Sequence, residues 1–386
     1  MSLAIVSETR FFGSNNAVSA RVWNYAQALR ATGERVFLLS YGDFCQGDKL
    51  IEVDPGIWGY KGDGRTDGNV KHFFTAMSAL VKDGVISGVL FYPTPNPSFE
   101  LRFMRWRRRM RFTNVVCEVN EVRRFEQTYV KSFSLPKRLL YKIITANSEK
   151  LTRRYRGLVC ISENIRQYFS RYNSLSVVVP ILSDMPDMMP ISECAPAPGG
   201  FLRFVFTGTI AIEKENLVEL LRGFYVFNKS FSSWELLLYG RVPEENQHRL
   251  ESILEILVLS DKVRFMGEAE HARIPAILSE ADCLILPRRN TPQNYYGFST
   301  KLSEYAVSGT PVILTDTGVV FHYFKDGRDC LKVNGYEAAG FCEQLLRFVN
   351  LTVAERDEIA SNAFKTAKES FDWRLYSSTL SGFIKQ

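Results

Sequence analysis

Residues 295–313 read YYGFSTKLSEYAVSGTPVI, which is the pattern of a loop, a short helix, a glycine turn and a buried strand. Ser299 or Thr300 is expected to cap the helix, because a side-chain hydroxyl can accept from the unpaired N–H groups of the first turn. Ser308 and Gly309 are expected to end the helix, since glycine readily adopts the left-handed conformation in which many helices terminate. An apolar strand is then predicted from Thr310.

The start of this helix is a candidate anion site. Its first turn offers free backbone N–H groups and the positive end of the helix dipole. Lys301 adds a charge in that turn, and Glu304 lies on the face of Thr300, one turn further along. A cation and a carboxylate placed in this way could hold a phosphate and a sugar hydroxyl together. The stretch therefore suggests a nucleotide-sugar site.

The composition is that of a globular protein with two domains. The chain has 386 residues, of which 46% are hydrophobic and 23% are charged. Its seven cysteines are scattered and never form a C-x-x-C pair, and its four histidines do not fall at metal-ligand spacing. We therefore expect reduced thiols, no metal site and no cofactor. The first residues do not resemble a signal peptide, and no apolar run is long enough to span a membrane, so a cytoplasmic location is expected.

The chain reads as two halves with alternating strands and helices. Strands at residues 3–7 and 36–40 flank a helix, which is the opening of a parallel, doubly wound sheet. The same pattern restarts at Phe201, after a segment rich in proline. The predicted organisation is an N-terminal domain at 1–182, a linker at 183–200, a C-terminal domain at 201–371 and a final helix at 372–386.

Two regions of the N-terminal half are candidate site loops. Gly13, Ser14 and Asn15 follow the first strand, where they would let an acceptor or a phosphate approach the backbone; a flexible loop is an equal alternative. Glu118 and Glu121 stand at the end of a later strand, where polar side chains of parallel sheets point toward the ligand crevice. Exposed loop carboxylates are the commoner explanation for such residues.

A helix at 101–111 concentrates positive charge. It carries six arginines with interleaved apolar residues. A solvated surface helix is the simplest interpretation. The alternative is a peripheral contact of Arg102–Arg111 with an anionic membrane surface or a lipid-phosphate acceptor. Nucleic acid is not expected as a partner, because no recognition motif accompanies the patch.

The C-terminal half resembles the glycogen-synthase-like (group 1) family of retaining glycosyltransferases. The resemblance rests on blocks that occur in the family's order over most of residues 201–350. They are FTG at 206–208 with Lys214 six residues on, LYG at 238–240, VRFMG at 263–267, ADCLILP at 281–287, GFSTKLSE at 297–304, GTPVI at 309–313 and the stretch 316–327. The N-terminal half matches more loosely. The resemblance implies an α/β protein of GT-B architecture, with two Rossmann-like domains facing a cleft and the C-terminal helix packing back on the N-terminal domain.

The resemblance also implies roles for particular residues. Glu304 corresponds to the glutamate that contacts the ribose, and Lys214 to a catalytic cation that stabilises charge on the leaving diphosphate. The implied nucleotide-sugar site consists of Gly208, Thr209, Lys214, Gly297, Phe298, Ser299, Thr300, Lys301 and Glu304.

Two positions depart from the family pattern. The family has two glutamates separated by seven residues, and Tyr296 stands where the first is expected. Thr209 replaces the usual arginine of the first loop, so a cation for the diphosphate is missing there. Replacement could come from Arg241, Arg288, Arg289 or Lys301, and the sequence does not choose among them. The sequence of residues 300–305 is a form associated with polysaccharide-assembly members.

The leading hypothesis is a retaining, metal-independent glycosyltransferase that moves a sugar from a UDP-sugar or GDP-sugar to a glycan or lipid-linked acceptor. Glu118 and Glu121 are candidate bases for the acceptor, with the donor phosphate as the alternative. Two other hypotheses are kept: a degenerate nucleotide-sugar-binding or scaffold protein, and a nucleotide-sugar epimerase. The arginine helix adds the expectation of a peripheral position at the inner membrane face.

Overall fold

The computed structural model describes residues 2–12, 17–60, 69–93, 97–125, 134–190, 200–212 and 214–386. The chain divides into two compact units. The N-terminal unit comprises Met1–Arg124, Phe133–Asp184 and Phe371–Gln386, and the C-terminal unit comprises Phe125–Ser132 and Met185–Ser370. The predicted loop Gly13, Ser14 and Asn15 lies outside the described residues.

The sheet of the N-terminal unit has the strand order β3-β4-β2-β1-β5-β6-β7-β8 in the part of the chain described. Its strands are β1 (Ser2–Ser7), β2 (Arg35–Ser40), β3 (Ile51–Asp54), β4 (Ile57–Gly59), β5 (Gly88–Phe91), β6 (Val115–Val119), β7 (Gly157–Cys160) and β8 (Ser176–Val178). All neighbouring pairs are parallel except β3 and β4. The central strands are buried on both faces, as parallel strands covered by helices are.

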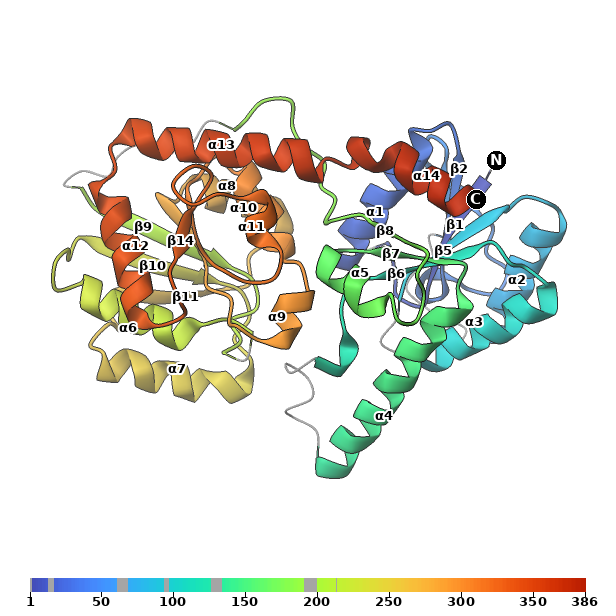
Figure 1. The fold of residues 1–386 in the computed structure, drawn as a ribbon, viewed down its shortest axis with the longest axis horizontal. Coiled ribbons are helices and arrows are strands. Elements are labelled where there is room, and N and C mark those ends of the chain that lie inside the picture. Colours follow the sequence, from blue (N-terminus) through green and yellow to red (C-terminus); the bar gives the residue numbers. More distant parts are fainter. Residues whose placement is uncertain are drawn as a thin grey trace. The chain divides into compact units, whose positions relative to one another are not determined.

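The helices of this unit are α1 (Ala17–Arg30), α2 (Val70–Lys82), α3 (Pro97–Met110), α4 (Leu135–Leu151), α5 (Glu163–Phe169) and α14 (Ser377–Lys385), with 3₁₀ turns at Tyr41–Asp43, Arg123–Phe125, Thr152–Arg154 and, before α14, at Trp373–Tyr376. The C-terminal helix α14 lies beside α1 (Figure 1). Its Leu380 and Ile384 belong to the same apolar core as Tyr25 and Leu29 of α1. The expectation that the last helix packs back on the N-terminal domain is therefore confirmed.

The C-terminal unit contains a parallel sheet with the order β11-β10-β9-β12-β13-β14 in its described residues. Its strands are β9 (Leu202–Thr207), β10 (Trp234–Tyr239), β11 (Val263–Gly267), β12 (Cys283–Leu286), β13 (Val312–Thr315) and β14 (Leu331–Val333). Its helices are α6 (Leu217–Phe227), α7 (Glu244–Ile256), α8 (Ile274–Ser279), α9 (Pro292–Tyr296), α10 (Thr300–Val307), α11 (Val320–Tyr323), α12 (Ala338–Asn350) and α13 (Val353–Phe371), with a 3₁₀ turn at His271–Arg273. Two parallel-sheet units with helices confirm the predicted α/β class.

The helix and strand predicted in residues 295–313 are confirmed. Ser299 is the N-cap of α10, Ser308 is its C-cap, and Gly309 follows with a φ of +78°. Strand β13 begins three residues further on, at Val312. The predicted loop before the helix is wrong at its start, because Tyr295 and Tyr296 end the short helix α9. That helix forms because the Thr291 hydroxyl accepts from the Asn294 N–H and a proline occupies its first turn.

Across the described residues, no helix combines the length and the apolar character that crossing a membrane requires. The predicted arginine helix is α3, and it is amphipathic. Phe103, Met104 and Trp106 are buried beneath it, while Arg105 and Arg109 are exposed. Its basic face is thus a solvated surface of the N-terminal unit.

Candidate active site

Glycines follow two adjacent strands, and the first of them makes room for a lysine. Gly208 follows β9 with a φ of +118°, and Gly240 follows β10 with a φ of +136°, both in the region that favours glycine. A Cβ atom on Gly208 would overlap the Cε and Nζ atoms of Lys301. The Lys301 ammonium also lies 4.1 Å from the centroid of the Phe206 ring. Glycine at 208 is therefore what lets Lys301, from α10, reach this strand end.

A buried carboxylate joins this lysine to an arginine. Glu215 lies before α6 and is 1% exposed. Its Oε1 is 3.1 Å from Lys301 Nζ and 3.2 Å from Arg288 Nη1. Arg288 follows β12, and its Nη2 donates to Ser299 Oγ at 2.7 Å. We call Glu215, Arg288 and Lys301 the Glu215 cluster, which links the segment before α6, the segment after β12 and the first turn of α10.

The charges in this cluster shift one another's pKa. Burial lowers the pKa of Lys301 to about 8; Glu215 opposes this shift, while Arg288 and Lys214 add to it. Burial alone would raise the pKa of Glu215, but Arg288, Lys301 and Lys214 outweigh it and leave that pKa below its usual value. Lys214 is therefore close enough to act electrostatically on both groups.

The cluster has hydrogen-bonding capacity left over. Among the described residues, Arg288 Nε, Arg288 Nη1 and Glu215 Oε2 are buried and have no hydrogen-bond partner. Buried polar atoms of native proteins are nearly always paired, by the protein, by water or by a ligand. Among the described residues of the cluster, the two cationic side chains Arg288 and Lys301 share the single carboxylate of Glu215. The site therefore has the positive charge and the spare donors that suit an anion.

Lys214 is held by its backbone. It is half-buried in the turn before Glu215, and its carbonyl accepts from Asn294 Nδ2 at 2.8 Å and from the Arg289 N–H at 3.2 Å. Asn294 belongs to α9 and was not identified from the sequence, where only the Thr291-Pro292 helix start could have drawn attention to it. The asparagine fixes the turn that carries the predicted catalytic cation.

Other predicted donor-site residues surround the cluster without joining it. The Thr209, Arg241 and Arg289 side chains are exposed, although Arg289 Nη1 donates to the Ile212 carbonyl at 3.2 Å. Glu304 is exposed on α10, and Gly297 and Phe298 are half-buried in the turn between α9 and α10. Of the proposed replacement cations, the structure thus brings Arg288 and Lys301 together. Glu215 was not predicted as a site residue; its place next to Lys214 was the available signal.

A tyrosine fixes α10 against the sheet. The hydroxyl of Tyr305 accepts from the Thr207 N–H at 2.8 Å, and Tyr305 is fully buried. Because this bond joins the middle of α10 to the end of β9, it sets the depth at which Lys301 sits beside Gly208. The same helix therefore carries the cation, the exposed Glu304 and the anchor that positions both.

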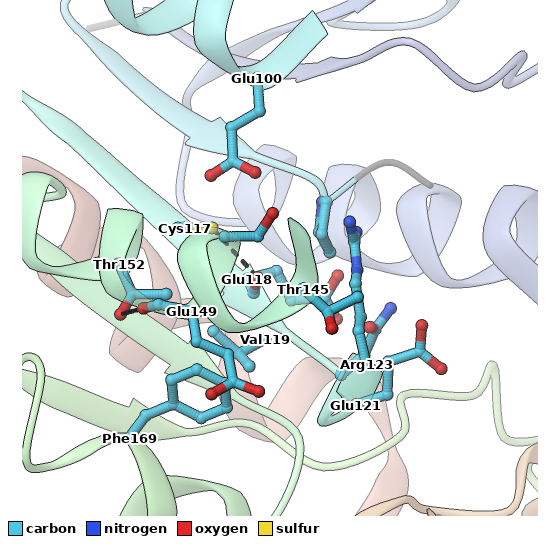
Figure 2. A pocket seen from close by; sticks show the side chains of 13 residues that line it. Glu100, Cys117, Glu118, Val119, Glu121, Arg123, Thr145, Glu149, Thr152 and Phe169 are labelled. Atoms are coloured by element: carbon cyan, nitrogen blue, oxygen red, sulfur yellow. Dashed lines mark hydrogen bonds between the residues drawn. The ribbon is translucent and has the colours of Figure 1, made fainter. Parts of the chain in front are cut away.

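In the N-terminal unit, Glu118 and Glu121 line one small cavity of about 40 Å³ (Figure 2). Glu118 is fully buried, forms an ion pair with Arg21 and accepts from the Tyr25 hydroxyl at 3.0 Å. Burial raises the pKa of Glu118, while Arg21 and its hydrogen bonds lower it. Glu121 is exposed. Glu118 thus has the contacts of a structural ion pair, and a cavity of this size has room for a few waters at most.

The comparisons with known proteins concern the matched region and the fold. The family described as "Glycosyl transferases group 1" matches residues 202–350. No protein of curated function matches the sequence.

Among solved structures, sucrose-phosphate synthase from Thermosynechococcus elongatus superposes with a TM-score of 0.73 at 14% identity, covering 100% of this chain and 98% of that chain. A trehalose-6-phosphate protein from E. coli, bound with UDP-2-fluoro glucose, gives 0.68 at 12% identity, with 100% and 99% covered. HepE of Anabaena, in complex with UDP and glucose, gives 0.65 at 13% identity, with 100% and 98% covered. Residues 202–350 match the group 1 glycosyltransferase family, and the chain as a whole has the GT-B fold of these solved structures.

Proposed function

We propose that this glycosyltransferase moves a sugar from a UDP-sugar to a glycan or lipid-linked acceptor, with retention of configuration and without a metal, in polysaccharide or glycoconjugate assembly. The observation that carries the proposal is the Glu215 cluster, a buried site with excess positive charge and unused arginine donors. A diphosphate leaving group needs this kind of surrounding, because fixed cations stabilise the negative charge that develops as the glycosidic bond breaks.

The start of α10 would add backbone donors. Ser299 is its N-cap, but the side chain makes no cap hydrogen bond, since its Oγ accepts from Arg288 instead. The Leu302 N–H donates to the Ser299 carbonyl at 3.1 Å, so in this proposal the two N–H groups before it are offered to a ligand oxygen, at the positive end of the helix. In this proposal Arg288, Lys301 and Lys214 neutralise the diphosphate, and Lys214, held by Asn294, acts on the leaving oxygen. The exposed Glu304 would meet the ribose hydroxyls.

UDP is preferred to GDP because of the structural neighbours. HepE of Anabaena has been solved with UDP and with UDP-glucose, and the E. coli neighbour holds UDP-2-fluoro glucose. A thermal-shift comparison of UDP, GDP and ADP tests this choice, because a ligand that binds the folded state raises the melting temperature. A larger shift with GDP than with UDP would reverse the choice of base.

Glu121 is the candidate base for the acceptor that is open to solvent, and the donor phosphate is its alternative. Glu118 is fully buried and paired with Arg21, so its carboxylate is not open to an acceptor hydroxyl. We expect Glu121→Gln to lower turnover while leaving UDP affinity and the melting temperature unchanged if the carboxylate is the base. Unchanged turnover would assign the proton to the donor phosphate.

A peripheral contact of α3 with an anionic membrane, at the inner face of the cytoplasmic membrane, belongs to the same proposal. Its support is the exposed arginine face, which includes Arg102, Arg105 and Arg109 and could attract acidic headgroups. Replacing Arg105 and Arg109 by glutamine should weaken binding to anionic vesicles. Equal binding by that variant would remove α3 from the proposal.

The direct test is release of nucleotide from UDP-glucose and related donors in the presence of candidate acceptors. Lys214→Ala should lower turnover by about 10²–10³-fold, as loss of one transition-state donor does. Lys365→Ala, which removes an exposed lysine of the same unit, is the matched control. Wild-type protein that binds UDP but releases no nucleotide, across a broad panel of donors and acceptors, would favour the scaffold hypothesis. Interconversion of the donor sugar without transfer would favour the epimerase.

A further inference from the structure

Helix α4 (Leu135–Leu151) exposes an unusual number of large apolar side chains. Leu135 is 78% exposed, Leu139 63%, Leu140 56% and Ile143 52%. Leu135, Leu139 and Ile143 are spaced four residues apart, so at 3.6 residues per turn they form one stripe along the helix. Clusters of this kind on a protein surface mark a contact with a membrane or another molecule. We call these four residues the α4 stripe.

The helix is attached to its unit by the opposite face and by its C-terminal half. Thr145 and Glu149 are buried there, and Glu149 accepts from Arg124 and from the Tyr168 hydroxyl. The N-terminal half of α4 extends away from the sheet of the N-terminal unit (Figure 1). The apolar residues of the stripe are therefore not needed to complete the core of that unit.

The charges on α4 select one occupant for the stripe. Lys142 flanks the stripe on one side and Lys137 flanks it on the other, while Arg138 and Lys150 add two more cations. Glu149 is the only acidic residue of the helix, and it is buried and paired. A basic helix with an exposed apolar face is the pattern of a helix that lies in the headgroup region of an anionic bilayer. A second copy of the chain fits poorly, because a two-fold contact would set these like charges against each other.

We propose that α4 docks this protein on anionic membranes by inserting the α4 stripe at the level of the lipid headgroups. The lysines would contact the lipid phosphates while the four apolar side chains leave water. This surface is separate from the basic face of α3 and does not depend on the transfer reaction. It gives the protein a defined element for reaching acceptors that are embedded in a bilayer.

The test is flotation of the full chain with vesicles of phosphatidylglycerol and phosphatidylcholine, and with vesicles of phosphatidylcholine alone. Wild-type protein should float with the anionic vesicles. The Leu139→Gln/Ile143→Gln variant should bind them at least about tenfold more weakly, because two large apolar side chains no longer leave water. Lys137→Gln/Lys142→Gln should lose binding to the anionic vesicles by a similar factor, and its residual binding should depend less on salt.

The matched control is Ile256→Gln/Val353→Gln, which removes two similarly exposed apolar side chains from the C-terminal unit. This variant and Arg105→Gln/Arg109→Gln should both keep the part of the binding to anionic vesicles that the α4 stripe supplies. Nucleotide release with a water-soluble acceptor should be unchanged in Leu139→Gln/Ile143→Gln, so failure of the docking proposal would be distinguished from failure of the proposed reaction.

Three results would overturn the proposal: wild-type protein that floats with neither kind of vesicle, equal flotation of wild type and Leu139→Gln/Ile143→Gln, or a dimer in sedimentation experiments that this variant converts to a monomer. The last result would assign the stripe to a second copy of the chain. Thermal unfolding of each variant checks that it is folded, which is expected because all the substituted side chains are exposed.

Discussion

In the described residues, each unit has one glutamate that is at most 1% exposed and lies beside cations, but the two sites are balanced differently. Glu118 is 0% exposed and Glu215 is 1% exposed, and Oε2 of each lacks a hydrogen-bond partner in the described residues. The difference lies in the cations. Arg21 is satisfied, since it donates to Glu118, the Tyr25 hydroxyl and the carbonyls of Val179 and Pro180.

Around Glu215, by contrast, the cations exceed what the carboxylate can satisfy. Arg288 Nη1 faces Glu215 only as an ion pair at 3.2 Å, Arg288 Nε is buried without an acceptor in the described part of the chain, and Lys301 shares the same carboxylate. A one-to-one pair with satisfied donors stabilises a fold, whereas an excess of buried cations becomes favourable when an anion arrives. Counting the donors that remain thus distinguishes the structural pair from the proposed binding site, although both contain a fully buried glutamate.

The largest expected effect is on the balanced pair. Arg21→Met should destabilise the protein by about 3–5 kcal/mol, because it leaves a buried carboxylate without its partner. Arg21→Met/Glu118→Leu should recover much of that loss, since no charge then remains buried. Urea unfolding followed by circular dichroism measures both variants. Equal stabilities of wild type and Arg21→Met would contradict the structural role of this pair.

Removing the central carboxylate of the Glu215 cluster should cost less. Glu215→Gln is expected to destabilise the apo protein by about 2 kcal/mol, because Lys301 can lose its proton and relieve the repulsion. UDP should bind this variant at least as tightly as wild type, since the excess positive charge has increased. Weaker UDP binding by Glu215→Gln, measured by calorimetry, would indicate that Glu215 itself contacts the ligand.

The smallest effect is a pH dependence set by Lys301. Its pKa is lowered to about 8, so the charged form that should bind a diphosphate is lost as the pH rises through that value. UDP affinity should therefore fall about tenfold between pH 7 and pH 9, and the fall should vanish in Lys301→Gln. The contribution of Lys301 to the folding stability of the apo protein should change with pH in the opposite direction to the UDP affinity. The folded state holds the proton less tightly than the unfolded state, so stability rises with pH between about 8 and 10.5. An identical pH profile of UDP affinity in wild type and variant would contradict the assignment.

Much of the C-terminal unit could be predicted because its signals are local. Ser299 as a cap, Gly309 after the helix and the apolar run from Val312 all act over a few neighbouring residues, and the structure contains the helix and strand they predict. Strand β4 (Ile57–Gly59) was missed, because a strand of this length within a glycine-rich segment shows no alternation. Helix α9 was missed for the same reason, since it is only a little longer than one turn.

The pairings of the buried charges could not be predicted, because they join residues far apart in the chain. Glu118 meets Arg21 across 97 positions, and Lys301 meets Glu215 across 86. The sequence did contain one relevant signal. Glu118 stands inside the apolar run VVCEV, and a carboxylate in a strand buried on both faces needs a cation nearby. That signal favours a structural pair over an accessible base.

The comparison of UDP with uridine tests the central claim most directly, because the two ligands differ by the diphosphate that the Glu215 cluster is proposed to bind. By calorimetry, wild-type protein should bind UDP at least about 100-fold more tightly than uridine, which corresponds to two charge-assisted hydrogen bonds. In Lys301→Gln and in Arg288→Gln this preference should fall by about tenfold, with uridine affinity unchanged. A preference for UDP that is the same in wild type and in both variants would contradict the claim.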